Sequence, residues 1–180
     1  MPPDAGFSSA EDQTLDVDLS FLAGSSYSII AVAARYGDRW PNNNYFIGTG
    51  YVNNDLPYGA LHVGWYDDST FRFSEFDDGY VDCPLTPDPN GTWQLQLSAV
   101  TFSVSSGKAV YLDGVLVGSN FDTRPLASAD QGGIGRGFLA SSNSTALQGG
   151  IAEILVFKEA LSNADRQQIE SYLRLKWDLQ

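Results

Sequence analysis

Hydrophobic residues in this chain recur in short runs or at every second position, which is the spacing of β-strands. Leu15, Val17 and Leu19 alternate with polar residues, and this pattern predicts a strand with one buried face. Residues 27–35 (YSIIAVAAR) and 149–157 (GGIAEILVF) are almost continuously apolar. Such runs are typical of central strands that are covered on both faces, so we expect two of them here.

Turn signals between apolar runs predict hairpins. Residues 60–66 and 71–76 flank the polar sequence DDST, and Asp113-Gly114 divides the apolar segment 109–118. An Asp-Gly pair between apolar runs is the strongest short-range signal of a tight hairpin. Further strands are expected at 45–49, 93–100, 101–105 and near Ile134, and loops at 40–59 and 77–92.

One helix is predicted, at 162–176. Ser162 with Asp165 three residues later is similar to an N-terminal capping arrangement. The apolar residues that follow share one face at helical spacing: Ile169, Tyr172, Leu173 and Trp177. About ten strands and one late helix predict an all-β fold, a two-sheet antiparallel sandwich with a C-terminal helix. We expect a single domain at 14–180 after a flexible lead at 1–13.

Composition narrows the classes of partner. The 180 residues include 22 acidic and 10 basic side chains, giving a formal net charge of −12. Such a surface repels phosphate backbones, so no nucleic-acid partner is expected. No apolar run approaches the length of a membrane span, so membrane insertion is not expected. The single cysteine, Cys83, cannot form an internal disulfide, and we expect a buried or idle thiol in a loop.

Four segments resemble a known family. They are ALHVGWYDDSTFRFSEFDD (60–78), YLDGVLVGS (111–119), GGIGRGFL (132–139) and LQGGIAEILVFKEALSNADRQQIESYLRLKW (147–177). They are similar to the laminin G-like group of the concanavalin A-like lectin/glucanase superfamily, and the resemblance extends over about 14–178. It implies a jelly roll of two antiparallel sheets, one of them concave. Members of this superfamily include lectins, glycosidases, lyases, adhesion domains and spacers, so function depends on the site.

The residues needed for catalysis are missing from the sequence. Relatives that hydrolyse β-glucans carry three acids at alternate strand positions, and only Glu75-Phe76-Asp77-Asp78-Gly79-Tyr80 comes near that pattern. Its third acid is absent, although glycoside hydrolysis needs two suitably spaced carboxylates. The single histidine, His62, cannot supply a zinc site, and neither a lyase set nor a serine nucleophile motif accompanies it. We therefore expect no catalytic residue, with a glycan-active hydrolase as a remote alternative.

Acidic residues gather around the first predicted hairpin. Carboxylates at loop tips are ligands that Ca²⁺ prefers, and several relatives in the superfamily hold Ca²⁺ at such a rim. The candidate ligands are Asp67, Asp68, Asp77, Asp78 and Asp82. The alternative is a solvated acidic rim that contributes to solubility.

Aromatic residues are frequent in the first half of the chain, among Asn, Gly and Asp: Trp40, Tyr45, Tyr51, Tyr58, Trp65, Tyr66 and Tyr80. Flat rings offer apolar area to sugar faces, while amides and carboxylates bind hydroxyl groups. The candidate ligand-binding residues are Trp65, Arg72, His62, Tyr66, Glu75, Tyr51 and Tyr58.

The predicted hairpin suggests how these candidates meet. With DDST as the loop, Trp65 would face Arg72, and His62 would face Glu75 on the opposite side of the sheet. Which of the two sides is concave stays open. Trp65 has a second interpretation, as a core residue beside Leu61 and Val63.

The sequence therefore favours a non-catalytic carbohydrate-recognition or adhesion module. We expect it to belong to a larger extracellular or cell-surface protein, bacterial in origin, in which flanking domains accompany it and a glycan or cell-surface polysaccharide is the partner. The alternative is a structural or protein-binding spacer domain that binds no sugar.

Overall fold

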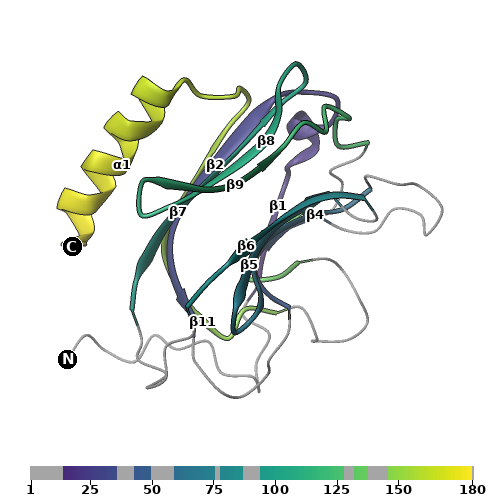
Figure 1. Cartoon of the computed structure of the whole chain (residues 1–180). Coiled ribbons are helices and arrows are strands. Elements are labelled where there is room, and N and C mark those ends of the chain that lie inside the picture. Colours follow the sequence, from purple (N-terminus) through teal and green to yellow (C-terminus); the bar gives the residue numbers. More distant parts are fainter. Residues whose placement is uncertain are drawn as a thin grey trace.

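The structure of the protein is a computed structural model. It describes residues 14–35, 43–49, 59–75, 78–86, 94–127, 132–137 and 146–179, and of residue 78 it describes the backbone alone. Two antiparallel sheets and one C-terminal helix confirm the predicted all-β sandwich (Figure 1). The six-stranded sheet contains, in spatial order, β1 (Leu15–Val17), β10 (Gly132–Ile134), β3 (Asn44–Gly48), β4 (Leu61–Asp67), β5 (Thr70–Glu75) and β6 (Asp78–Pro84). The five-stranded sheet contains β11 (Gly149–Phe157), β2 (Tyr27–Arg35), β7 (Gln96–Ser103), β8 (Gly107–Leu112) and β9 (Val115–Asn120). A short 3-10 helix, η1 (Ser20–Leu22), follows β1, and α1 (Asn163–Trp177) follows β11.

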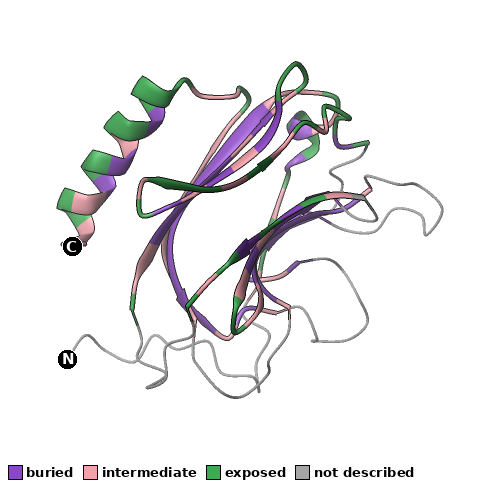
Figure 2. Cartoon of the chain, viewed as in Figure 1, coloured by how far each residue is buried: buried purple, intermediate pink, exposed green. Residues whose placement is uncertain are grey.

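The elements form three layers with two hydrophobic cores (Figure 2). The larger core lies between the two sheets and includes Phe46, Phe71, Phe73 and Phe102. The smaller one lies between the five-stranded sheet and α1 and centres on Leu173. Since α1 covers the outer face of the five-stranded sheet, the six-stranded sheet has the outer face on which no described helix packs (Figure 1).

The two apolar runs occupy different places in the same sheet. β2 lies between β11 and β7 and is buried on both faces, which confirms its prediction as a central strand. The prediction was wrong for β11, which is an edge strand paired only with β2. Its residues are apolar because one face packs on the inter-sheet core and the other on the helix-side core. An apolar run indicates that both faces of a strand are covered. It does not indicate whether both edges of the strand are hydrogen-bonded to neighbouring strands.

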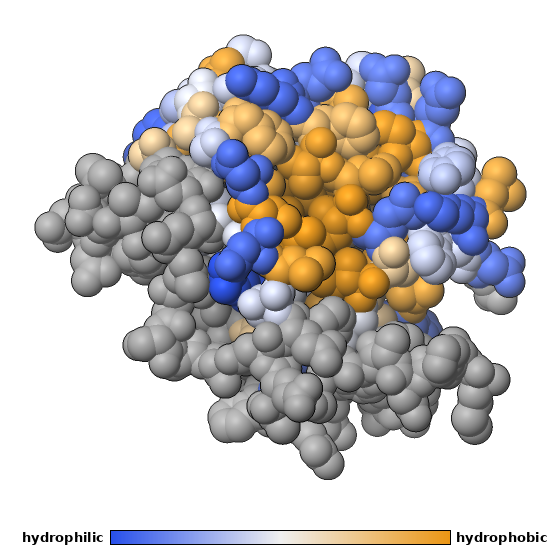
Figure 3. Space-filling view, turned by 180° about the vertical axis from the view of Figure 1, so that it is seen from behind, coloured by the Kyte–Doolittle hydropathy of each residue, from blue (hydrophilic) through white to orange (hydrophobic). Residues whose placement is uncertain are grey.

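The two sheets are closest at one end of the strand order. β6 and β9 contact each other, so β1 and β11 form the opposite edges of the sandwich. Viewed from behind, hydrophobic residues gather in the middle of the surface, with hydrophilic ones above them and on both sides (Figure 3). At these far edges the core is less completely covered, because Val17, Ile151, Ile154 and Val156 are only partly buried. Within the part of the chain that the structure describes, no helix is long and apolar enough to cross a membrane.

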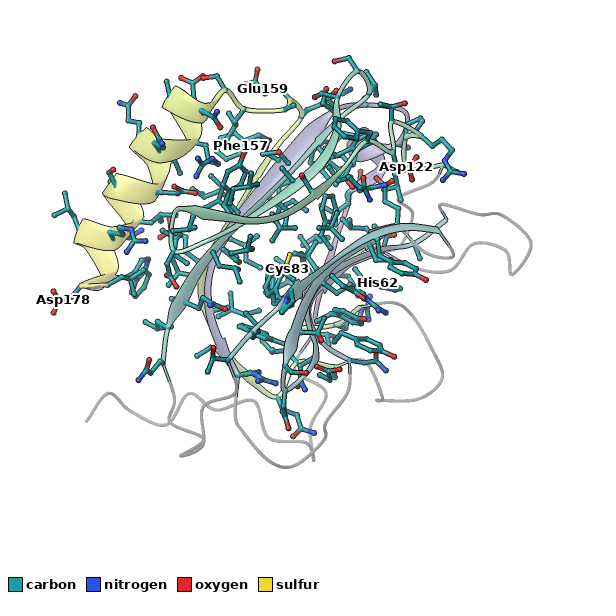
Figure 4. All side chains as sticks on the ribbon, in the orientation of Figure 1. His62, Cys83, Asp122, Phe157, Glu159 and Asp178 are labelled. Atoms are coloured by element: carbon teal, nitrogen blue, oxygen red, sulfur yellow. The ribbon has the colours of Figure 1, made fainter. Side chains whose placement is uncertain are left out.

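A strand replaces part of the loop predicted at 77–92. In β6, Val81 and Cys83 point into the inter-sheet core and alternate with Tyr80 and Asp82 (Figure 4). The neighbouring Asp, Gly and Pro residues obscure this alternation in the sequence. The expectation of a buried thiol is confirmed, and burial raises the pKa of Cys83 to about 11.

The predicted hairpin at Asp113-Gly114 is confirmed and joins β8 to β9. Both turn residues have left-handed backbones, with φ of 49° at Asp113 and 81° at Gly114. These signs are the ones that a two-residue hairpin turn requires, because its twist must match that of the strands. The strands predicted at 93–100 and 101–105 are one continuous strand, β7.

The helix begins as its capping signal predicts. The Ser162 hydroxyl oxygen accepts a hydrogen bond from the backbone N–H of Asp165. Leu173 is fully buried against the sheet, whereas Tyr172 is 55% exposed, so placing Tyr172 on the packed face was wrong. The helix instead presents a buried Arg166–Glu170 pair to the sheet, and the Arg166 guanidinium lies 3.6 Å above the Tyr111 ring centre. A charged pair of this kind cannot be recognised from hydrophobic periodicity.

Candidate functional site

The β4–β5 hairpin has a different register from the predicted one. Trp65 pairs with Phe71, Gly64 with Arg72, and the ladder is irregular between Trp65 and Asp67. Tyr66 is the extra residue of a bulge, so each partner on β5 shifts by one position. A shift of one residue moves side chains to the other face of the sheet. The predicted contacts of Trp65 with Arg72 and of His62 with Glu75 were therefore wrong.

Trp65 lies inside the sandwich. Its side chain is 4% exposed, and its ring packs edge-on against Phe46 and Phe71, with 5.9 Å between ring centres in both cases. Arg72 is on the opposite face of the same sheet, since it pairs with Gly64 and not with Trp65. The interpretation of Trp65 as a core residue therefore describes it, and a sugar cannot stack on its ring without unpacking the core.

Glu75 also points inward. Its Oε1 accepts a hydrogen bond of 2.6 Å from the Tyr27 hydroxyl, and its Oε2 lies 3.0 Å from Lys108 Nζ. Burial raises the pKa of Glu75, and the nearby Lys108 opposes that rise. Glu75 is thus part of a buried polar cluster between the sheets and does not contribute to the outer face with His62 and Tyr66. Sequence reasoning missed Lys108 and Tyr27, because nothing in a strand pattern marks a buried lysine.

The outer face of the six-stranded sheet carries a compact group of aromatic and charged side chains from β4, β5 and β6. The Arg72 guanidinium lies 3.7 Å from the Tyr66 ring centre and 4.8 Å from that of Tyr80. It donates two hydrogen bonds to Asp82, from Nε to Oδ1 at 2.7 Å and from Nη2 to Oδ2 at 2.8 Å. We call Tyr66, Arg72, Tyr80 and Asp82 the outer-face cluster.

Two further rings continue this group along the sheet. Tyr45 and His62 stack with 5.0 Å between ring centres and an interplanar angle of 15°. Both are buried, and His62 points away from the inter-sheet core into which Cys83 points (Figure 4). Burial, with a smaller contribution from Arg72, lowers the pKa of His62 to about 4, so the imidazole is neutral at pH 7. Burial raises the pKa of Tyr45 to about 12.

The accessible part of this face is the outer-face cluster. Tyr80 is 52% exposed and the Asp82 side chain 39% exposed, while Tyr66 and Arg72 are half-buried. Rings held at fixed positions beside a guanidinium and a carboxylate can take the apolar and the hydroxyl-bearing parts of one polar ligand. Sequence reasoning named Tyr80 only as one aromatic among several and Asp82 only as a metal ligand, because it did not predict β6.

Among the other predicted residues, the two that the structure describes have separate partners. Asp67 accepts hydrogen bonds from the Ser69 backbone and hydroxyl, and Asp68 pairs with Arg35 at 3.0 Å. Tyr51, Tyr58, Asp77 and the side chain of Asp78 lie outside the described residues. Among the residues that are described, no group of three or more His, Cys, Asp or Glu side chains could hold a metal ion. The calcium site remains a prediction.

Several solved structures share this fold at low sequence identity. The NanB sialidase of Streptococcus pneumoniae aligns over 89% of this chain and 26% of its own, with 16% identity and a TM-score of 0.64. The CBM40 of the Ruminococcus gnavus IT-sialidase, bound to α2,3 sialyllactose, aligns over 92% of this chain and 96% of its own, with 13% identity and a TM-score of 0.62. Domain 4 of AbnA, an extracellular arabinanase from Geobacillus stearothermophilus, was solved with arabinotriose and aligns over 87% of this chain and 72% of its own (13% identity, TM-score 0.61).

The chain spans about a quarter of the length of the sialidase chains it matches, and nearly the full length of the CBM40. No curated protein matches it in sequence. The amino-acid pattern that defines one family matches residues 11–165, most of the chain and both of its sheets. On that match, the chain belongs to the Laminin_G_3 family of the concanavalin A-like lectin/glucanases superfamily.

Proposed function

We propose that this chain is a carbohydrate-binding module without catalytic chemistry of its own, and that a glycan binds to the outer-face cluster. The observation that carries the proposal is the exposed Tyr80 ring beside the Arg72–Asp82 pair, on the sheet face that α1 does not cover. A sugar ring stacks on an aromatic face, and its hydroxyl groups bind charged and amide groups at the rim.

The geometry of the cluster favours binding because it is held in place before a ligand arrives. The Arg72 guanidinium contacts both the Tyr66 and the Tyr80 rings and is fixed by two hydrogen bonds to Asp82. Side chains that are already ordered lose little conformational freedom on binding. Tyr80 and Asp82 lie at the exposed surface, so we expect weak binding per domain, strengthened where several modules occur in one extracellular or adhesive protein.

The solved structures are consistent with this proposal. The CBM40 was solved with sialyllactose and the arabinanase domain with arabinotriose, so other proteins with this fold bind glycans of different chemistry. Which sugar binds here depends on this chain's own residues. An arginine beside tyrosines suits hydroxyl-rich sugars and tolerates an acidic one.

Two observations argue against hydrolysis. Glycoside hydrolases place two carboxyl groups on either side of the scissile bond. Here Glu75 points into the core and pairs with Lys108. Asp82 accepts hydrogen bonds from two nitrogens of the Arg72 guanidinium, Nε and Nη2. We therefore expect no release of reducing ends from any polysaccharide, and Glu75→Gln should not alter that result.

The experiment is a glycan array, followed by calorimetry on the best ligand, with the intact chain. Tyr80→Ala should lower affinity at least tenfold, because the ring supplies the stacking surface. Tyr172→Ala is the matched control, since Tyr172 on α1 is 55% exposed and Tyr80 is 52% exposed. Equal affinities in the two variants would contradict the site. If no glycan binds at all, the spacer function becomes the better description.

A further inference from the structure

Three ionisable side chains from different elements meet inside the sandwich. Lys108 on β8 places its Nζ 3.0 Å from Glu75 Oε2 on β5 and 3.3 Å from Asp122 Oδ2, just beyond β9. The Lys108 and Glu75 side chains are 0% exposed, and the Asp122 side chain is 12% exposed. The Lys108 amine and the carboxyl groups of Asp122 and Glu75 thus lie together. They are at the end of the sandwich where Asp122 is labelled (Figure 4).

The surroundings bury Lys108 and Glu75 and hold the cluster in place. The Tyr27 hydroxyl donates to Glu75 Oε1, and the Phe102 ring centre lies 5.4 Å from Lys108 Nζ. Gly79 packs directly against the pair: a Cβ there would lie 1.8 Å from Asp122 Oδ2 and 3.0 Å from Lys108 Nζ. Only a glycine permits so close an approach, and its φ of 68° also favours glycine.

From this arrangement we propose that Lys108 and Asp122 join spontaneously in an intramolecular isopeptide bond, with Glu75 carrying the protons. The proposal is independent of glycan binding, since the cluster lies between the sheets and the outer-face cluster lies outside them.

The reaction balances without any added reagent. The Lys108 ammonium gives one proton to the Glu75 carboxylate and becomes a neutral amine. Glu75 passes this proton to one Asp122 oxygen, so that the amine meets a neutral carboxylic acid. The nitrogen attacks Asp122 Cγ, a C–N bond forms, and the C=O electron pair becomes a negative charge on the other oxygen. Glu75 takes a second proton from the nitrogen and delivers it to the hydroxyl group, the C–O bond breaks, and water leaves as the C=O bond forms again. An ammonium and a carboxylate thus become one neutral amide and one water, and the total charge does not change.

Positioning and electrostatics favour each step. Lys108 Nζ lies 3.3 Å from Asp122 Oδ2, an oxygen bonded to the carbon that the amine would attack, and groups held in such proximity gain a large advantage over the same groups free in solution. Arg124 donates from Nε to Asp122 Oδ1 at 2.8 Å, so it lies where the negative charge of the intermediate develops. Burial raises the pKa of Glu75, which suits a group that must accept and return a proton. The product replaces two buried charges by one amide, and buried charges are costly to desolvate.

Two other ion pairs in the described part of the chain lack these conditions. Lys176 Nζ lies 2.8 Å from Glu153 Oε2, but the Lys176 side chain is 40% exposed, so water competes and the ammonium is solvated. The Arg166–Glu170 pair is buried, but a guanidinium stays protonated and is not a nucleophile. Lys176 therefore serves as the matched control lysine.

The primary test is the intact mass of the folded wild-type chain. We expect the mass of the sequence minus one water, and a protease digest with a branched peptide that links Lys108 to Asp122. An unmodified mass after prolonged incubation of folded protein would overturn the proposal. So would a water loss located elsewhere, such as a succinimide at Asp78-Gly79 or Asp113-Gly114. A succinimide reacts with hydroxylamine and hydrolyses in mild alkali, whereas the isopeptide bond survives both.

Variants then test the roles of the three groups. Lys108→Arg and Asp122→Ala should keep the full mass, because each removes a reacting atom. Glu75→Gln should keep it as well, because the amide cannot carry the proton, and an undiminished water loss in this variant would overturn the role of Glu75. Lys176→Arg should lose water as the wild type does. If a variant fails to fold, the wild-type mass and its branched peptide still decide the question.

Discussion

The buried polar residues Tyr27, Glu75 and Lys108 find their partners across the two sheets. Glu75 on β5 is bound by Tyr27 on β2 and Lys108 on β8, so three strands contribute to one cluster. Each of these residues alone has an unremarkable place in a strand pattern. Their meeting depends on the register of both sheets, which is why the sequence predicted Glu75 on the wrong face.

His62 gives a pH dependence that can be measured. Burial and Arg72 lower its pKa from 6.5 to about 4, so between these values the unfolded chain binds more protons than the folded one. The resulting stability is complete above pH 6.5 and is lost as the pH falls toward 4, by about 3 kcal/mol in total. Urea unfolding of the wild type and of His62→Gln at several pH values isolates this contribution.

The comparison with His62→Gln is needed because Glu75 acts in the opposite direction. Its pKa is raised in the folded chain, so its contribution to stability is lost as the pH rises above 4.5. The difference between wild type and His62→Gln removes the Glu75 contribution from both. If the difference is constant between pH 4 and 6.5, the histidine is not the group that titrates.

The core position of the Trp65 ring can be tested by truncating it. Because its ring is packed between Phe46 and Phe71, Trp65→Ala should destabilise the fold by about 3–5 kcal/mol. Tyr80→Ala, which truncates an exposed ring, should change stability by less than about 0.5 kcal/mol. Chemical denaturation of both variants checks the pair. A small effect at Trp65 would mean that the ring is not part of the core.

For the strands and turns, the sequence predicted their positions along the chain better than it predicted which residues pair across neighbouring strands. The β8–β9 hairpin was predicted with its turn, because Asp113-Gly114 supplies the two left-handed residues that the turn needs. The β4–β5 hairpin was predicted with the wrong pairing, because the bulge at Tyr66 adds a residue that alternation does not reveal. The outer-face cluster depends on that bulge and on β6, so its members could be named but not assembled.

The helix allows a prediction with a neighbouring control. Leu173 on α1 is fully buried against the five-stranded sheet, and the adjacent Tyr172 is 55% exposed. Leu173→Ala should therefore cost about 2–5 kcal/mol, whereas Tyr172→Ala should change stability by less than about 0.5 kcal/mol. Thermal or urea unfolding distinguishes the two. Similar losses in both variants would mean that the helix packs through a different face.

At the scale of the molecule, the layered architecture followed from the sequence while its edges did not. About ten predicted strands, the turn signals between them and the late helix were enough to predict two packed sheets with one helix. The edge position of β11 could not be read from its residues, because both of its faces are covered as those of a central strand would be. The net charge of −12 is a property of the whole surface and indicates how the molecule responds to ions.

Calcium binding has to be distinguished from a general salt effect. Any salt stabilises a chain with this charge to some degree, because it screens the repulsion between like charges. A specific site predicts more than that. Millimolar CaCl₂ should raise the melting temperature above the value in NaCl of equal ionic strength, since a ligand that binds only the folded chain stabilises it. Replacing Asp77 and Asp78 with Asn should remove the difference. Asp16→Asn is the control, because Asp16 is an exposed carboxylate paired with Arg136 and is not one of the candidate ligands. Equal melting temperatures in the two salts would leave a solvated acidic rim as the description of these residues.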